Sequence, residues 1–290
     1  MTRRRHPVLR TLVVASLCGA VLAGVGALLF ADVSLGPEVG VVEIQGVIED
    51  GTATLETLEH FRTTSHVVAV VLRLDSPGGA VGPAQEIWDA VGRLRAKKPV
   101  IASLGNVAAS AAYYVASAAD VIVSNPGTLT GSIGAIMELP NAAGLAEKLG
   151  VDMAVVKGGA FKDIGSPVRP LTDAERAVLQ TMVDDVVRQF VEAVAQGRKM
   201  PVERVRALAD GRPLSGAQAQ ASGLVDELGG LDTAVRLAWE RAGKTGEPRV
   251  HRVHGRRWPW WARLVGAAIG PGGPGLGGGL LLLYGGGLPR

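Results

Sequence analysis

The residues best suited to chemistry in this chain are a serine and a glycine-rich turn, each at the end of a predicted strand. Ser110 follows the strand-like run Val100–Ser103 and precedes Ala111–Ala119, which predicts a helix. A hydroxyl at such a junction lies close to the backbone N–H groups of the helix start, which favours a nucleophile. The alternative is that Ser110 is one more small residue in a packed helix, and the motif alone does not decide between the two.

The second chemical signal is the pentapeptide Asp75–Gly79, which directly follows a predicted buried strand over Val67–Leu74. Pro77 fixes its own φ, and the paired glycines allow a positive φ and the close approach of another backbone. A turn of this kind can offer free N–H groups to a substrate carbonyl. The same five residues also have an ordinary interpretation as a tight turn.

A serine nucleophile needs a neighbouring base, and the histidines are poorly placed to supply one. No histidine lies between His66 and His251, where the α/β core is predicted. A Ser-His-Asp triad is therefore disfavoured, although His60 and His66 stay open as bases. Lys162 is the other candidate, as a partly buried amine whose pKa is lowered until it accepts a proton. The alternative is an exposed lysine beside Asp163.

Strands and helices alternate around these residues, which predicts an α/β protein with a parallel sheet. Strands are predicted at Val39–Ile48, Val67–Leu74, Val100–Ser103, Val121–Ser124 and Val151–Val156, and helices at Thr54–Arg62, Val81–Arg95, Asn141–Leu149 and Leu231–Arg241. A longer helix opens with a capping box at Thr172 and Glu175 and ends near Lys199. We expect its apolar stripe to cover the sheet, with a neighbouring subunit as a further possible contact. Thr128–Gly134 is predicted to be a hydroxyl-rich loop.

Composition sets limits on the function. The chain has 290 residues, of which 47% are hydrophobic and 40 are glycine, and its formal net charge is +3. This small charge gives no reason to predict a nucleic-acid partner. The single cysteine excludes an intrachain disulfide, and no group of residues has metal-ligand spacing. We therefore expect neither a metal nor a cofactor.

The N-terminus resembles a membrane anchor. Thr11–Phe30 carries no charge and its ~20 residues suffice to cross a bilayer. Arginines precede it and Asp32 follows, which predicts a cytoplasmic N-terminus and an extracytoplasmic catalytic domain. A cleaved signal peptide is the alternative, but its apolar region is normally shorter. The predicted organisation is a basic tail (1–10), a single-pass anchor in the cell membrane (11–31), a catalytic domain (38–245) and a C-terminal tail (246–290) whose Trp258–Trp261 contacts lipid.

Taken in order, the motifs resemble the signal peptide peptidase A family, also called protease IV. The resemblance is carried by Asp75–Gly79, Ala108–Ser110, Tyr113–Tyr114, Ala118–Asp120, Thr130–Gly134, Phe161–Asp163 and Ser166–Pro167, and it runs from about Val39 to Ala242. It implies a ClpP/crotonase-like β-α-β repeat fold. It also implies the short bacterial form, in which one copy of the domain carries both members of a Ser-Lys dyad.

The resemblance assigns roles to particular residues. It implies that Ser110 is the nucleophile, that Lys162 is the general base, and that Ser132 hydrogen-bonds and orients the lysine amine. The backbone N–H groups of Gly78 and Ala111 would form the oxyanion hole. Together these roles imply a serine endopeptidase.

The resemblance also predicts how a substrate binds. An extended apolar peptide would add a strand along Gly79 and Ala80 and place small side chains in shallow pockets. The implied substrates are signal-peptide remnants and other apolar segments, and the implied assembly is a homo-oligomeric ring. Leu280–Tyr284 is similar to the C-terminal peptides that some family members place in their own groove. We therefore predict that this segment occupies the substrate groove, in cis or from a neighbour, with disorder as the alternative.

Two other functions stay open at this point. One is a membrane protease of the same fold that acts on whole or misfolded membrane proteins, as the stomatin-associated proteases do. The other is a crotonase-like scaffold that binds partners or acyl thioesters without proteolysis. Substrate profiling separates the first from a signal peptide peptidase. Loss of peptidase activity in a Ser110→Ala variant would exclude the second.

Overall fold

The structure is a computed structural model that describes residues 16–21, 36–252 and 281–283. The chain divides into two units, Met1–Pro37 and Glu38–Arg290, which we describe separately. In the first unit, residues 16–21 are helical and exposed. Within the described ranges, no helix has both the length and the apolar character that a membrane span requires. Most of the predicted anchor at 11–31, and all of Trp258–Trp261, lie outside these ranges.

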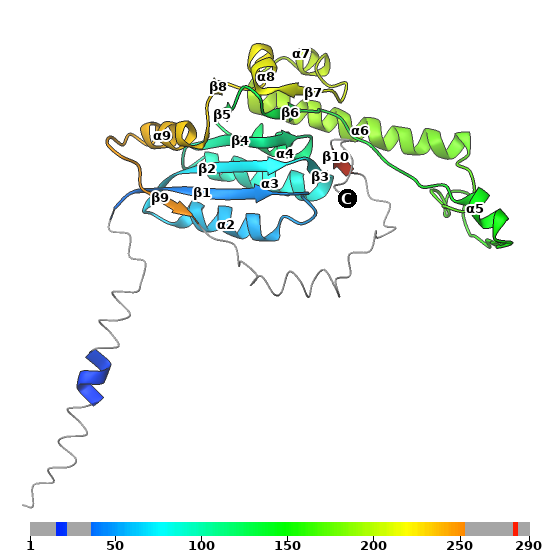
Figure 1. Cartoon of the computed structure of the whole chain (residues 1–290), viewed down its shortest axis with the longest axis horizontal. Helices are drawn as coiled ribbons and strands as arrows, with labels where there is room; N and C mark the ends of the chain where they lie inside the picture. The colour runs from blue at the N-terminus through cyan, green and yellow to red at the C-terminus, as the bar shows by residue number, and fades with distance from the viewer. Residues whose placement is uncertain (1–15, 22–35, 253–280, 284–290) are drawn as a thin grey trace, which may run out of the picture. The chain divides into compact units, whose positions relative to one another are not determined.

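The second unit is built on an eight-stranded mixed sheet (Figure 1). Its main order is β7-β6-β4-β2-β1-β9, while β5 pairs with β4 and β8 pairs with β5. The strands are β1 (Glu38–Gln45), β2 (Val67–Ser76), β4 (Val100–Ala109), β5 (Val121–Ser124), β6 (Leu129–Gly131), β7 (Pro213–Ser215), β8 (Glu227–Leu228) and β9 (Val250–Arg252). Neighbouring strands are parallel except β6 and β7. The predicted α/β class is confirmed, and the arrangement fits a ClpP-like fold.

Helices cover both faces of this sheet. They are α2 (Thr52–Thr63), α3 (Val81–Arg95), α4 (Ala111–Ala116), α5 (Ala143–Lys148), α6 (Asp173–Arg198), α7 (Val202–Arg206), α8 (Gly216–Ser222) and α9 (Leu231–Arg241). Val70 and Leu72 of β2 belong to the core with α2, α3 and α4, whereas Ala69 and Val71 belong to the core with α9. Successive side chains of a strand point to opposite faces. Burial on both faces therefore explains why the central strands are continuous apolar runs.

Helix ends follow local capping rules. The Thr172 hydroxyl accepts a hydrogen bond from the Glu175 N–H at the start of α6, and the Glu175 side chain accepts one from the Thr172 N–H. The same capping box opens α8 at Ser215, and α8 ends at Gly223, whose φ of 86° is left-handed. The start and stop of α6 confirm the predicted ends of that helix. The caps of both helices use residues adjacent to them in sequence.

Three predicted elements differ in the structure. Val151–Val156 is exposed and forms no strand, because it lies away from the sheet and β-branched residues form a strand only where a neighbouring strand pairs with them. Thr128–Gly134 is not all loop, since β6 pairs with β4 and β7 inside it. The helix predicted over Ala111–Ala119 ends at Ala116.

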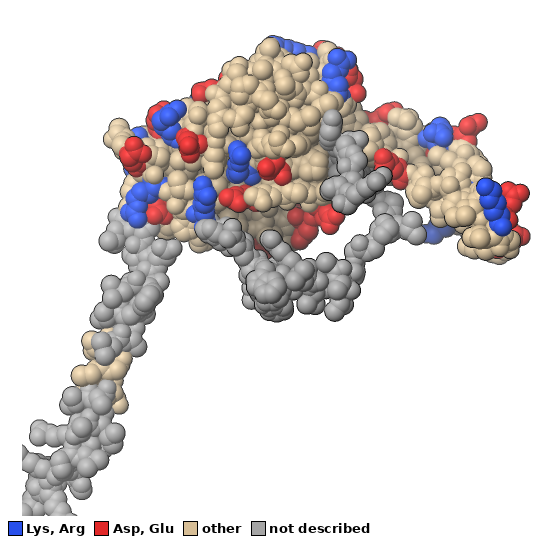
Figure 2. All heavy atoms as spheres, viewed as in Figure 1, with Lys and Arg blue, Asp and Glu red and all other residues tan. Residues whose placement is uncertain are grey.

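Residues 136–182, which we call the arm, extend from the body of the unit along α6 to α5 (Figure 1). Phe190 and Val194 in the C-terminal half of α6 are buried, whereas Val178 and Met182 are 40% and 51% exposed. The apolar stripe of α6 therefore covers the core only in its C-terminal half. On the face drawn in Figure 2, charges of the two signs are intermingled, and much of the arm's surface is uncharged.

Candidate active site

Parallel strands bring the predicted site residues to one edge of the sheet. Ser76 at the end of β2 is in register with Ala108 of β4, and Ala109 is in register with Gly131 of β6. The carboxyl ends of neighbouring parallel strands lie at the same edge of a sheet, where ligands of open α/β sheets bind. Ser110 and Ser132, which directly follow β4 and β6, therefore lie beside each other.

Ser110 occupies the turn between β4 and α4. Its φ of 55° and ψ of −121° are unusual for a residue with a side chain, and such backbone strain clusters at functional sites. The Ser110 N–H donates to the Gly131 carbonyl at 2.9 Å, and its own carbonyl accepts from the Tyr114 N–H at 2.8 Å. The side chain is buried, and Oγ has no hydrogen-bond partner among the described residues. A buried hydroxyl without a partner is costly and rare unless it has a function.

The glycine turn forms a short strand, β3 (Gly78–Ala80), directly after β2. One edge of β3 pairs with Ile48, whose N–H donates to the Gly78 carbonyl at 2.8 Å and whose carbonyl accepts from the Ala80 N–H at 2.7 Å. A Cβ at Gly79 would lie 2.2 Å from the Ile48 oxygen, so only glycine fits there. β3 lies close to α4, the helix that follows Ser110. The glycine turn is therefore near the serine, as its proposed role in offering N–H groups to a substrate carbonyl requires.

Both predicted oxyanion-hole donors are at this edge. Ala111 is the first residue of α4, so its N–H has no acceptor within the helix. The Gly78 N–H donates to the Ser76 hydroxyl at 3.1 Å. An anionic oxygen is a stronger acceptor than a hydroxyl. A substrate oxyanion at this position would therefore compete well for the Gly78 N–H.

Ser132 lies beside Ser110 and next to a groove. Its φ is 50°, and its hydroxyl donates to the Gly211 carbonyl at 3.2 Å. The groove has a volume of about 480 Å³ and runs between the Ser132 loop and α6, with Asp184 and Asp210 in its lining. The Asp210 carboxylate is paired with Arg212, and that of Asp184 accepts a hydrogen bond from Gln180 at 2.7 Å.

Lys162 is held elsewhere, on the arm. Its side chain is exposed and makes no hydrogen bond or ion pair with the part of the chain that the structure describes. The neighbouring Asp163 binds Lys157 and Arg169. In a single chain Lys162 is thus an exposed lysine beside Asp163, as in the alternative interpretation of the sequence, and not a partly buried amine.

Ion pairs at the start of α6 fix this part of the arm. Arg169 bridges Asp163 and Glu175, with its Nε 3.0 Å from the Asp163 carboxylate and its Nη1 2.8 Å from that of Glu175. The Arg169 guanidinium is the main cause that lowers the pKa of Asp163 well below its usual range. Hydrogen bonds from Arg169 and from the Thr172 N–H lower the pKa of Glu175 to about 2. Both carboxylates are thus charged at neutral pH and hold the Lys162 segment to α6.

The segments that carry the two members of the predicted dyad are attached to different parts of α6. The Phe190 ring packs against Tyr114, one helical turn after Ser110, at a centroid distance of 5.1 Å. Glu175, which anchors the Lys162 segment, precedes Phe190 by 15 positions in α6, or ~22 Å along the helix axis. A single chain therefore brings Ser110, Ser132, Gly78 and Ala111 together but leaves Lys162 apart from them.

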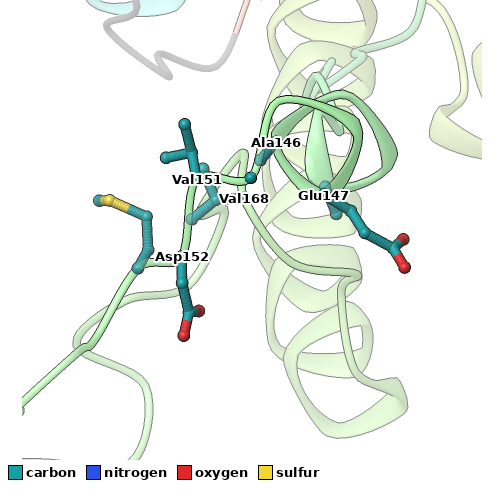
Figure 3. A pocket seen from close by; sticks show the side chains of 8 residues that line it. Ala146, Glu147, Val151, Asp152 and Val168 are labelled. Atoms are coloured by element: carbon teal, nitrogen blue, oxygen red, sulfur yellow. The ribbon is translucent and has the colours of Figure 1, made fainter.

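The arm also carries a shallow pocket. Ala146, Glu147, Val151, Asp152 and Val168 line it together with Ala143, Gly150 and Met153. In Figure 3 the carboxylates of Glu147 and Asp152 lie on opposite sides and point away from each other. Because polar groups do not converge in this pocket, it is not a second candidate for the reaction site.

A segment far away in the sequence pairs with the glycine strand. Leu281–Leu283, labelled β10, runs antiparallel to β3, with Leu281 opposite Ala80 and Leu283 opposite Gly78 (Figure 1). The sequence predicts that Leu280–Tyr284 occupies the substrate groove, and its three described residues pair through the backbone with β3. Gly79 and Ala80, the predicted substrate-binding residues, are both part of the pairing.

Comparisons with known proteins point to one family. The sequence profile of peptidase family S49 matches residues 92–244. A putative protease of Synechocystis sp. is 43% identical over 70% of this chain and 73% of its own length. The putative signal peptide peptidase SppA of Enterococcus faecium is 38% identical over 62% of this chain, and the chloroplastic serine protease SPPA of Arabidopsis thaliana is 35% identical over 65%. The matched segment spans only 53% of the Enterococcus protein and 28% of the Arabidopsis protein.

Proposed function

Because the chain belongs to peptidase family S49 and is a serine peptidase, we propose that Ser110 is its nucleophile and Lys162 its general base. Ser110 Oγ attacks the carbonyl carbon of a peptide bond while the neutral Lys162 amine takes the hydroxyl proton. The N–H groups of Gly78 and Ala111 stabilise the oxyanion. The proton passes to the leaving amine, an acyl-enzyme ester forms, and water hydrolyses this ester with Lys162 again acting as the base.

The observation that carries this proposal is the state of Ser110. It combines a positive φ, a position at the carboxyl end of a central strand, and a buried Oγ without a hydrogen-bond partner in the described chain. Other serines at this end of the sheet have partners. Ser76 Oγ contacts Gly78, and Ser132 Oγ contacts Gly211. Ser110 is therefore the hydroxyl that gains most from a reaction partner or a base.

We place Lys162 in the reaction through a second copy of the chain. Within one chain, the segments of Ser110 and Lys162 are attached to α6 about 15 residues apart, through Tyr114 with Phe190 and through Arg169 with Glu175. The groove beside Ser132 is open. This groove has room for the lysine of a neighbouring arm, whose amine Ser132 at the groove's edge would orient. The resulting site draws its nucleophile from one subunit and its base from the next.

The surface of the arm supports such an assembly. Leu145, Leu149 and Phe161 are 59%, 69% and 47% exposed. Large apolar side chains gathered on one projecting segment are typical of protein–protein contacts. A head-to-tail contact, in which the arm of each copy reaches the body of the next, closes into a ring. We therefore propose a homo-oligomeric ring in which the arm is the contact element.

The substrate is an apolar peptide bound in an extended conformation. The pairing of Leu281–Leu283 with β3 shows that this edge can accept a strand, as many peptide-binding sites do. In that register Leu283 is opposite Gly78, so a peptide bound in the same way would place the residues before the scissile bond along β3. Signal-peptide remnants, the substrate in the name of the Enterococcus relative, are the class that we propose.

The proposed location places the enzyme next to its substrates. The uncharged stretch within 11–31 would anchor the chain in the cell membrane with a cytoplasmic N-terminus, and the catalytic domain would lie outside the cytoplasm. Fractionation of cells that express the full chain tests this location. Alkaline extraction should leave the protein in the membrane fraction, and recovery in the soluble fraction would contradict the anchor.

Labelling of the active serine tests the proposed chemistry. A fluorophosphonate should label the full chain and fail to label a Ser110→Ala variant. Ser103→Ala is the matched control, because Ser103 is a buried serine of β4 whose Oγ accepts a hydrogen bond from Arg73. Its labelling should be unchanged. Equal labelling of the Ser110→Ala variant and the native chain would refute the assignment.

A further inference from the structure

Two histidines and a glutamate meet at the end of the sheet opposite the candidate active site. Glu38, His66 and His251 each offer one ligand atom, and these atoms all lie within 4.8 Å of one another. Glu38 begins β1, His66 directly precedes β2, and His251 is in the middle of β9. The three strands are neighbours in the order β2-β1-β9, so the sheet itself holds the cluster together.

Backbone pairing fixes the positions of all three residues. The Glu38 N–H donates to the His66 carbonyl at 2.8 Å, and His251 is in register with Gly40, two residues after Glu38. Side chains two positions apart on a strand share a face, so Glu38 and His251 point to the same side of the sheet. His251 Nδ1 lies 3.2 Å from Glu38 Oε2, and the two imidazole rings are 6.1 Å apart between centroids.

The donor set matches a divalent metal of the zinc type. Two imidazole nitrogens and one carboxylate oxygen form a recurrent three-ligand zinc set, in which water takes the fourth position. Ligand atoms at ~2.1 Å from a tetrahedral ion are ~3.4 Å apart. The Glu38–His251 distance already fits this geometry, and a small rotation of the His66 ring would bring in the third ligand.

The surroundings orient the ligands. Glu38 is only 7% exposed, and Arg249 lies 3.6 Å from its other oxygen, Oε1, which leaves Oε2 to face the histidines. The Phe61 ring packs edge-on against the His251 ring at 5.6 Å. Partners of this kind fix the rotamers of metal ligands and shield the site from water.

We propose that Glu38, His66 and His251 bind one Zn²⁺ ion. The sequence predicts no metal here because residues 38, 66 and 251 share no local spacing, and only the order of the strands brings them together. The ion would fasten β9, a three-residue edge strand, to β1. β9 lies near the start of the predicted C-terminal tail (246–290), so the metal would fix the point from which the rest of the tail leaves the sheet.

Zinc titration of the full chain tests the site. With Zn²⁺ as the only ligand, we expect a stoichiometry of one ion per chain, and Co²⁺ in its place should give the strong visible absorption of four-coordinate cobalt. His66→Ala should weaken the affinity about 100-fold or more, since removal of a ligand costs at least as much as loss of an orienting partner. Folding should tolerate this change, because the His66 ring makes no hydrogen bond to another described residue.

His60→Ala is the matched control. His60 lies in α2 near the cluster but is not one of its ligands, so its replacement should leave the zinc affinity unchanged. Hydrogen exchange gives a second measurement, in which zinc should slow exchange of the β9 amides in the native chain and in the His60→Ala variant only. No binding at submillimolar zinc, or equal affinity in native and His66→Ala chains, would overturn the proposal.

Discussion

The edge that carries Ser110 and the arm that carries Lys162 are built in opposite ways. Ser110 is held by two backbone hydrogen bonds in a core of buried alanines and tyrosines. Lys162 is exposed on a segment that ion pairs attach to the first turn of α6. A single chain thus holds the proposed nucleophile beside the proposed oxyanion donors but does not bring the proposed base to them. The proposed catalysis therefore depends on assembly, whereas the local structure around Ser110 does not.

The sharpest test of this contrast removes each member of the dyad. Ser110→Ala and Lys162→Ala should each lower the cleavage rate of an apolar fluorogenic peptide by roughly 10³–10⁶-fold, as removal of one catalytic group does in other serine peptidases. A 1:1 mixture with subunit exchange should then recover about a quarter of the native activity, because random neighbours restore both groups at one site in four.

The mixing experiment has its own control. Ser110→Ala mixed with a double variant that also lacks Lys162 should recover no activity, since no intact nucleophile is present. If the two single variants in exchanging oligomers show no recovery, the lysine acts within its own chain, and the contrast between the two regions would not extend to catalysis.

The edge beside Ser110 and the arm should differ in how much stability they lose when a glycine is replaced by alanine. Gly79→Ala places a Cβ 2.2 Å from the Ile48 oxygen, so we expect a loss of about 1–3 kcal/mol in the free energy of unfolding, as for other overpacked sites. Gly144→Ala in α5 meets no atom within 4 Å and should be neutral or stabilising by up to about 1 kcal/mol. Denaturant titration measures the free energy of unfolding of both variants. Equal destabilisation would contradict the difference between the two regions.

Removal of the tail should expose the edge beside Ser110. Because β10 pairs with β3, a chain that ends at Gly270 should cleave peptides a few-fold faster, mainly through a lower KM, as competition for β3 disappears. Replacement of residues 271–290 by a Gly/Ser sequence of equal length controls for tail length. The idea fails if truncation leaves both peptide cleavage and self-processing of the C-terminus unchanged.

The smallest expected effect concerns acid pH and the arm. The pKa of Glu175 is lowered to about 2 from an ordinary 4.5, mainly by its hydrogen bond with Arg169. A lowered pKa in the folded state contributes stability above pH ~4.5, and this contribution is lost as the pH falls towards 2. Hydrogen-exchange protection in the first turns of α6 should therefore decline over that range while that of β4 stays constant. Glu175→Gln should reduce the dependence on pH and leave the part that comes from Asp163, whose pKa Arg169 also lowers.

Much of the fold could be predicted because its signals are local. The ends of α3 and α9 agree with the sequence patterns, and the capping residues of α6 and α8 lie beside the helices that they cap. Val151–Val156 was predicted wrongly because its β-branched residues resemble a buried strand. A strand also needs a partner, and the arm supplies none in its described part.

The site divides in the same way. Ser110 and Gly78 could be brought together from sequence because each follows a predicted strand of one parallel sheet. Ser132 follows β6, whose residues are predicted as loop, and only the family resemblance placed it with them. The distance between Lys162 and Ser110 could not, because it depends on the length and direction of α6. The Glu38, His66 and His251 cluster could not be predicted either, since it requires the order of three strands that are distant in sequence.

The pairing of β3 with Ile48 limits the direction in which a peptide can bind beside Ser110. Ile48 closes one edge of β3, so an incoming chain has only the other edge, and β10 runs along it antiparallel. Peptide polarity is therefore fixed relative to Ser110. A peptide and its reversed sequence have the same composition and mean hydropathy, yet the pockets along β3 would receive their side chains in opposite order. Recognition at this site would thus depend on the direction of the peptide chain as well as on its hydrophobicity.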